Sequence, residues 1–216
     1  MVFVDAWNIF ITKKDIIFSA LNTHILLVVW SSCIAIALGI TVGILISRSR
    51  RLGEVVVGIA GALYTIPILA LLGFLIPIMG IGTKPAVVAL TIYSLLPVLR
   101  NTYVGINQVS AAAKEAAVGM GASKGQVLMR VELPLAFPVI IAGIRTSVVM
   151  SFSMATYATF IGGGGMGNII MQGMRTYNSG LMVAGTIVVA LATVLLDRLI
   201  GWLENGVQKK YGLLGA

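Results

Sequence analysis

The chain has 216 residues, of which 58% are hydrophobic and 10% are charged. With a mean hydropathy of +1.02, this composition excludes an ordinary soluble domain and is typical of a membrane protein. The net charge of +8 does not indicate nucleic acid as a partner, because the basic residues form no face interleaved with aromatic ones. Loops rich in Lys and Arg on the cytoplasmic side of a membrane account for it better.

The first third of the chain predicts two membrane spans. Residues 1–20 mix aromatic and charged side chains, and we interpret them as an interfacial segment that is retained in the mature chain. A first span over about residues 21–46 is followed by a cluster of arginines at 48, 50 and 51, which marks the cytoplasmic side. A second span over about 55–78 contains Pro67 at its middle. Such a proline frees backbone carbonyls, and either a simple kink or a place on a transport path would explain it.

Three more spans are expected over about residues 85–104, 135–161 and 181–203. Arg145 lies inside the fourth span, where either snorkelling to the interface or a role in transport would explain it. The glycine-rich run at 162–167 lacks the Gly-Lys-Ser/Thr ending of a phosphate loop, so we expect a tight reversal at the outer surface. Asp197 and Arg198 near the end of the fifth span are expected to shield one another or to snorkel. Residues 205–216 are expected to form a cytoplasmic tail.

The distribution of basic residues gives this five-span interpretation an orientation. Of the 15 Lys and Arg residues, ten fall on one side, four fall on the other and Arg145 lies within the membrane. Positive residues concentrate on the cytoplasmic side. The N-terminus is therefore expected outside, and the C-terminus and the loop at 105–134 inside.

The loop at 105–134 carries strong helix punctuation. Ser110 is a candidate N-cap, and Gly119 and Gly121 are natural places for a helix to end. Ser123 with Gln126 three residues later predicts a capping box, and a stop is expected before Pro134. The expected order is helix, glycine corner, helix, proline stop. The loop is too polar to cross a bilayer, because it carries Lys114, Glu115, Lys124, Arg130 and Glu132.

No catalytic chemistry can be assigned to the chain. It has one histidine and one cysteine, no phosphate-binding loop and no set of residues spaced for a metal or for nucleophilic catalysis. No acidic residue falls in the middle of a predicted span, as proton- or sodium-coupled carriers require. Energy for uphill transport would therefore come from another subunit.

The loop also resembles the "EAA" signature of permeases of bacterial ATP-binding-cassette (ABC) importers. The matching residues are Glu115, Ala116, Ala117, Gly121, Val131, Leu133 and Pro134, with Val131 where the family more often has isoleucine. The resemblance implies an all-α membrane domain over 21–204 with two cytoplasmic coupling helices, to which Ser123 also belongs. It further implies a separate ATPase subunit that holds ATP and magnesium, a second permease chain, an extracytoplasmic substrate-binding protein and a place in the bacterial inner membrane.

Outside the loop, the chain resembles the permeases that import glycine betaine, choline and carnitine. The resemblance lies in residues 96–105, 131–135, 142–146 and 161–167, with Gly163 and Met166 where the family more often has alanine and leucine. A methionine or other amino-acid importer permease is the alternative, and a non-transporting assembly subunit is a third. Candidate residues for the transport path are Tyr64, Pro67, Tyr93, Phe152 and Tyr157.

Overall fold

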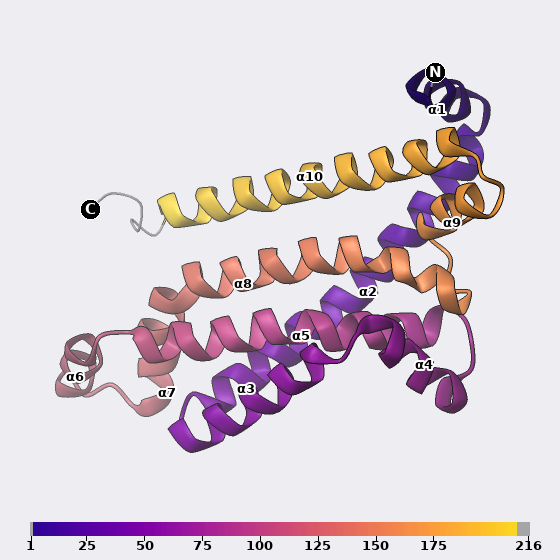
Figure 1. Ribbon diagram of the computed structural model, residues 1–216. Coiled ribbons are helices and arrows are strands. Elements are labelled where there is room, and N and C mark those ends of the chain that lie inside the picture. The colour runs from indigo at the N-terminus through magenta and orange to yellow at the C-terminus, as the bar shows by residue number, and fades with distance from the viewer. Residues whose placement is uncertain (1, 211–216) are drawn as a thin grey trace.

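The computed structural model describes residues 2–210, and within them every regular element is a helix (Figure 1). The elements in chain order are α1 (Val2–Thr12), α2 (Lys14–Ile46), α3 (Arg50–Thr65), α4 (Ile68–Met79), α5 (Thr83–Gln108), α6 (Ala111–Gly119), α7 (Lys124–Val127), the π-helix η1 (Leu128–Glu132), α8 (Leu133–Met154), the 3₁₀ helix η2 (Ala155–Ile161), α9 (Gly167–Arg175) and α10 (Ser179–Lys210).

Four of these segments are long and apolar enough to cross a membrane, and α3 with α4 forms a broken fifth. This confirms the prediction of about five spans, with different boundaries. Residues 2–20, which lie in the expected interfacial segment, form α1 and the first turns of α2, and α1 packs against α10. α5 begins at Thr83, two residues before the expected Pro85. At the other terminus, α10 runs through the start of the expected tail to Lys210, and residues 211–216 lie outside the described residues.

Helices α2, α5 and α8 form the centre of the bundle, and small residues allow their close approach. A Cβ atom on Gly39 would lie 2.8 Å from Val98 of α5, and one on Gly43 would lie 2.6 Å from Thr102. The same holds between α5 and α8, where a Cβ on Gly143 would lie 2.8 Å from the carbonyl oxygen of Pro97. Small residues at such positions let membrane helices pack backbone to backbone.

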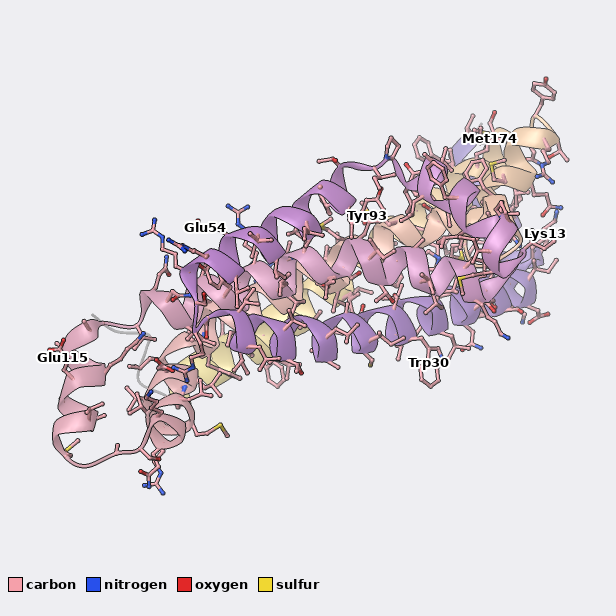
Figure 2. All side chains as sticks on the ribbon, turned by 90° about the horizontal axis from the view of Figure 1, so that it is seen from below. Lys13, Trp30, Glu54, Tyr93, Glu115 and Met174 are labelled. Carbon is pink, nitrogen blue, oxygen red and sulfur yellow. The ribbon has the colours of Figure 1, made fainter. Side chains whose placement is uncertain are left out.

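The bundle has two chemically different ends, which Figure 2 shows. Glu54 and Glu115 lie at one, which we call the loop end because it carries residues 110–132. Lys13 and Met174 lie at the other, which we call the glycine end because it carries residues 162–167. The arginines that follow α2 lie at the loop end, as the five-span order requires.

Pro67 breaks the second span rather than bending it slightly. Helices α3 and α4 meet at an angle of 94°, and Ile66 and Pro67 have extended ψ angles of 125° and 134°. The hydroxyl group of the buried Tyr93 on α5 donates a hydrogen bond to the carbonyl of Ile66. A neighbouring helix therefore satisfies a backbone group at the break, which is one of the two ways in which a membrane interior tolerates one.

The glycine-rich run forms the expected reversal. Gly162, Gly164 and Gly165 have φ angles of 72°, 82° and 85°, a left-handed region in which only glycine is free of strain. The fully buried His24 on α2 fixes this run: its Nδ1 accepts from the Met166 amide at 3.3 Å, and its Nε2 lies 2.8 Å from the Phe152 carbonyl oxygen. The ring is therefore the neutral tautomer with its proton on Nε2.

Arg145 forms ion pairs instead of snorkelling freely. Its guanidinium group binds both carboxylate oxygens of Asp197, at 2.7 and 2.9 Å, and an oxygen of Glu204 at 3.1 Å. Arg198 was the expected partner of Asp197. The ion pair forms instead with Arg145, because α10 directs Asp197 towards α8. Gly201 makes room, since a Cβ there would lie 3.0 Å from the guanidinium.

Candidate functional site

The segment at 110–134 projects from the loop end as two short helices joined by a turn (Figure 1). The Ser110 side chain accepts from the Ala113 amide and caps α6 as predicted. Gly121 has a φ angle of 84°, its amide donates to the Val118 carbonyl at 2.9 Å, and the Ala122 amide donates to the Ala117 carbonyl at 3.0 Å. These two bonds are the Schellman pattern that ends helices at a left-handed glycine.

The second helix begins as predicted but does not end as predicted. Ser123 and Gln126 form both bonds of a capping box. The chain then passes through the π-helix η1 directly into α8, so the expected stop before Pro134 is wrong. A proline lacks the amide proton and crowds the carbonyl four residues earlier. The wider π turn, closed by the Leu133 amide on the Leu128 carbonyl, accommodates both effects.

The predicted signature residues separate into two groups. Glu115, Ala116, Gly121 and Ser123 are exposed on the projecting part, whereas Ala117 is buried beneath it. Val131, Leu133 and Pro134 are half-buried at the base of α8. Leu133 packs there against the cluster of Ile106, Ala136 and Ile140, which joins α5 to α8.

The projecting part also exposes apolar side chains. Val118, Met120 and Met129 are 59%, 83% and 65% exposed. They lie beyond the bundle, next to charged residues. We call α6, its glycine turn and Met129 the docking face. Exposed apolar groups on a polar projection are typical of a protein interface, and methionine suits adaptable contacts.

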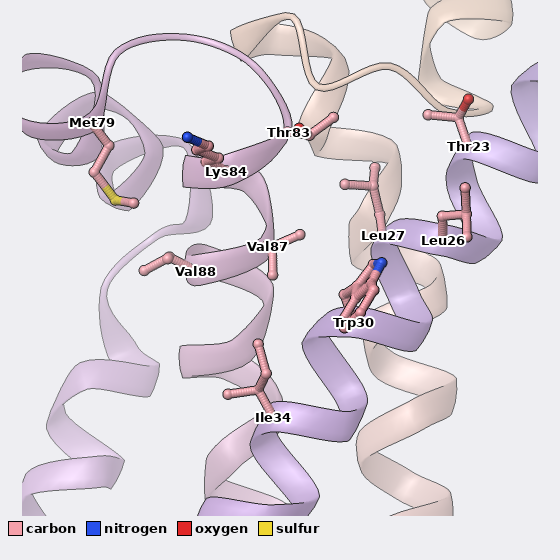
Figure 3. A pocket seen from close by; sticks show the side chains of 10 residues that line it. All are labelled: Thr23, Leu26, Leu27, Trp30, Ile34, Met79, Thr83, Lys84, Val87 and Val88. Carbon is pink, nitrogen blue, oxygen red and sulfur yellow. The ribbon is translucent and has the colours of Figure 1, made fainter.

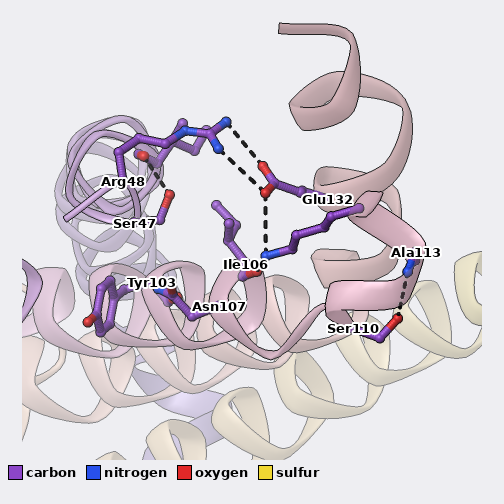
Figure 4. A network of polar contacts seen from close by, with 10 residues as sticks. Ser47, Arg48, Tyr103, Ile106, Asn107, Ser110, Ala113 and Glu132 are labelled. Atoms are coloured by element: carbon purple, nitrogen blue, oxygen red, sulfur yellow. Dashed lines mark hydrogen bonds and ion pairs between the residues drawn. The ribbon is translucent and has the colours of Figure 1, made fainter. Parts of the chain in front are cut away.

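A buried ion cluster lies below the docking face, and sequence reasoning missed it (Figure 4). Glu132 is only 4% exposed, although its place in a polar loop suggested a solvated charge. Its Oε2 lies 3.1 Å from Arg48 Nη2, and its Oε1 lies 3.4 Å from both Arg48 Nη1 and Lys114 Nζ. The contact at Oε2 lacks hydrogen-bond alignment, so it is an ion pair alone. Lys114 also donates to the Ile106 carbonyl at 3.2 Å.

The candidate path residues do not all come together. Tyr64 and Tyr93 lie beside the break at Pro67, with ring centroids 5.5 Å apart. Phe152 is buried against the His24 ring, with centroids 4.6 Å apart, and it belongs to the same buried cluster as Tyr93, against which Tyr64 packs. Tyr157 lies in η2 near the glycine end, 38% exposed and stacked on Phe160. The structure therefore groups four of the five candidates, Tyr64, Pro67, Tyr93 and Phe152, and leaves Tyr157 apart.

A groove of about 530 Å³ lies between α2 and the start of α5 (Figure 3). Its walls are mostly apolar, with Trp30, Leu26 and Ile34 on α2 and Val87 and Val88 on α5, and Lys84 lies at its rim. None of the five path candidates lines this groove. Among the described residues, no group of His, Cys, Asp and Glu side chains is arranged to hold a metal ion.

Five spans and a projecting helical loop are the architecture of an importer's membrane subunit, and comparison with known proteins agrees. Residues 35–209 match the family described as "Binding-protein-dependent transport system inner membrane component", and the chain belongs to this family. It is thus a transporter permease subunit of the inner membrane.

Several curated proteins similar to the chain are osmoprotectant permeases. The chain is 42% identical to the glycine betaine/carnitine/choline transport system permease protein OpuCD of Bacillus subtilis, over 88% of this chain and 84% of that protein. It is 43% identical to the carnitine transport permease protein OpuCD of Listeria monocytogenes, covering 87% and 86%. It is 39% identical to the osmoprotectant import permease protein OsmW of Salmonella typhimurium, covering 86% of each.

Solved structures share the fold at low sequence identity. The MetNI methionine ABC transporter in an inward-facing conformation matches with a TM-score of 0.83 and 21% identity, over 91% of this chain and 98% of that one. An amino acid ABC transporter crystallised with histidines matches with a TM-score of 0.77 and 18% identity, covering 90% and 95%. The chain therefore has the fold of an ABC importer permease, and the likeness to these two structures decides nothing about the solute.

Proposed function

We propose that this permease imports a quaternary-ammonium osmoprotectant such as glycine betaine, choline or carnitine, and that it does so together with a second permease chain. Support comes from the curated relatives of similar length, whose names carry these solutes. The methionine alternative rests on structures only 21–22% identical. A substrate-binding protein on the outside would select the solute, with an aromatic cage for the ammonium group.

We also propose that energy reaches this chain through the docking face, and the exposure of apolar side chains there is the observation that carries this proposal. Val118, Met120 and Met129 are exposed beyond the bundle on a segment that also exposes Glu115. A separate ATPase subunit, which holds ATP and magnesium, would cover these side chains on the cytoplasmic side. Of the signature residues, Glu115, Ala116, Gly121 and Ser123 would contact it. Ala117, Val131, Leu133 and Pro134 would support them from below.

The path for the solute would pass between the two permease chains, beside Tyr64 and Tyr93. Motion of the coupling helices would rock the spans around this path. With the docking face in the cytoplasm, the glycine end and the N-terminus would lie outside, and α10 would end in the cytoplasm.

The solute is tested in two steps. The partner binding protein is titrated with glycine betaine, choline, carnitine and methionine. The permease, reconstituted in liposomes with its ATPase, is then assayed for hydrolysis stimulated by the loaded binding protein. We expect stimulation by at least one quaternary ammonium compound and none by methionine. Stimulation by methionine alone would refute the solute assignment, and a failure of every loaded binding protein to stimulate hydrolysis would favour a non-transporting assembly subunit.

Gly121 and Gly119 provide a matched pair for the docking face. A Cβ atom added to either glycine would have no other group within 4 Å, but only Gly121 has a positive φ angle. Gly121→Ala should strain the turn by about 1 kcal/mol and shift the docking face, so that solute-stimulated ATP hydrolysis falls while membrane insertion persists. Gly119→Ala, within α6, should behave like the wild type. Equal activity of both variants in the stimulated ATPase assay would contradict this role of the turn.

A further inference from the structure

Glu132 is a buried carboxylate held by two cations from separate elements. Burying a carboxylate is costly unless it is paired, and the partners of Glu132 come from distant parts of the chain. Lys114 lies on α6, Arg48 follows the end of α2, and Glu132 closes η1 at the base of α8. One carboxylate thus joins the docking face to two spans.

Its burial distinguishes this cluster from ordinary surface pairs. The Glu132 side chain is 5% exposed, against 28% for Lys114 and 47% for Arg48. The neighbouring pair of Arg50 and Glu54 at the same end of the bundle is 89% and 61% exposed. Water and salt screen such an exposed pair, and its contribution is small. The contacts of Glu132 are screened far less and can transmit displacement.

The π turn sets the direction of the Glu132 side chain. A π-helix holds one more residue in the turn than an α-helix does, and one residue corresponds to about 100° of rotation. Relative to α8, the residues before the π turn therefore point in a different direction from the one that a continuous α-helix would give them. Pro134 favours the wide turn because it lacks an amide proton for a regular helical bond. The half-buried signature residues at the base of α8, including Pro134, thus hold the Glu132 carboxylate within reach of Arg48 and Lys114.

We propose that Glu132 is the positioning residue through which displacement of the docking face reaches α2 and α8. This rests on the proposed function, in which an ATPase subunit moves α6. When α6 moves, Lys114 carries the carboxylate with it, and the carboxylate draws the base of α8 and, through Arg48, the end of α2. Without the negative charge, Lys114 and Arg48 repel each other and α6 moves without the spans.

The test compares Glu132→Gln with Glu54→Gln in the permease–ATPase complex reconstituted in liposomes. Three quantities are measured: cross-linking of α6 to the ATPase, basal ATP hydrolysis, and its stimulation by the solute-loaded binding protein. We expect Glu132→Gln to keep the cross-link and the basal hydrolysis and to lose stimulation about tenfold, within the usual range of coupling between sites. Glu54→Gln, the same change in an exposed pair, should leave all three unchanged.

Lys114→Met supplies an independent arm, because Glu132 keeps Arg48 as its partner and the fold is retained. Stimulation should fall, and the double variant with Glu132→Gln should be no worse than Glu132→Gln alone, as expected for residues acting in one network. Normal stimulation in Lys114→Met, or additive losses in the double variant, would overturn the proposal. If Glu132→Gln does not assemble, the result for Lys114→Met decides. Absence of the cross-link in the wild-type complex would instead refute the proposed function.

Discussion

Gly167→Ala is expected to prevent stable folding of the permease, whereas Gly163→Ala in the same run should destabilise it less. A Cβ atom on Gly167 would overlap the carbonyl oxygen of Thr156, a backbone atom that cannot turn away. A Cβ on Gly163 would lie 2.9 Å from the Ala158 carbonyl oxygen, also a backbone atom, and 3.1 Å from the Ala86 Cβ. This overlap is smaller than that at Gly167, but it still requires a shift of the neighbouring backbone. Overpacking of a fixed backbone costs about 3 kcal/mol, a large part of total stability.

The two alanine variants are compared by their yield of folded, monodisperse protein in detergent and by the thermal midpoint of unfolding. Alanine is also the residue that the osmoprotectant permeases more often carry where this chain has Gly163, in keeping with the smaller overlap there. Equal thermal midpoints for the two variants would show that the turn between η2 and α9 rearranges freely. The contact of Gly167 with Thr156 would then not fix the glycine end.

Arg145→Met is expected to detach α10 from α8 at the loop end. The change removes the guanidinium that binds both carboxylate oxygens of Asp197 and takes away one partner of Glu204. A charge that loses its partner within a span is unfavourable. The thermal midpoint in detergent should fall by several degrees, and α10 should become accessible to proteases. Removing one member of such a pair costs more than replacing both.

A second substitution distinguishes the ion pair from simple packing. Asp197→Asn in the Arg145→Met background removes the charge that the first change left unpaired, so it should restore part of the lost midpoint. If the double variant is no more stable than Arg145→Met, the guanidinium stabilises the bundle by its volume against Gly201 and not by its charge.

Local features of the fold were predictable from the sequence because they depend on neighbours in the chain. The cap at Ser110, the left-handed Gly121 and the capping box of Ser123 with Gln126 each involve residues within one turn. Span number followed from hydropathy, and the signature pattern located the docking face. Pro67 marked a distortion of the second span, but the sequence predicted a kink at most and not the 94° break.

Other features depend on which helices become neighbours, and the sequence alone does not determine that. Arg145 lies 52 residues from Asp197, and Arg48 lies 84 residues from Glu132. Hydropathy placed Arg145 inside a span and the other three near the ends of spans or in the loop, and it did not indicate these two pairings. Pro134 misled for a different reason, since a proline at the start of α8 stops an α-helix but not a π turn. The packing of α1 on α10 likewise joins helices that lie far apart in the sequence, and hydropathy gives no sign of it.

Cysteine cross-linking tests the docking face most directly. In a Cys33→Ala background, a single cysteine is placed at Met120 on the docking face or, as the control, at Ile81. Ile81 is 75% exposed in the turn before α5, next to Gly82, whose amide donates to the Ile161 carbonyl beside the glycine-rich run. The complex with the ATPase is assembled in membranes and treated with a short bifunctional reagent. We predict a permease–ATPase product from position 120 and none from position 81. A product from position 81 alone, or labelling of position 120 by an impermeant reagent added outside intact cells, would contradict this account.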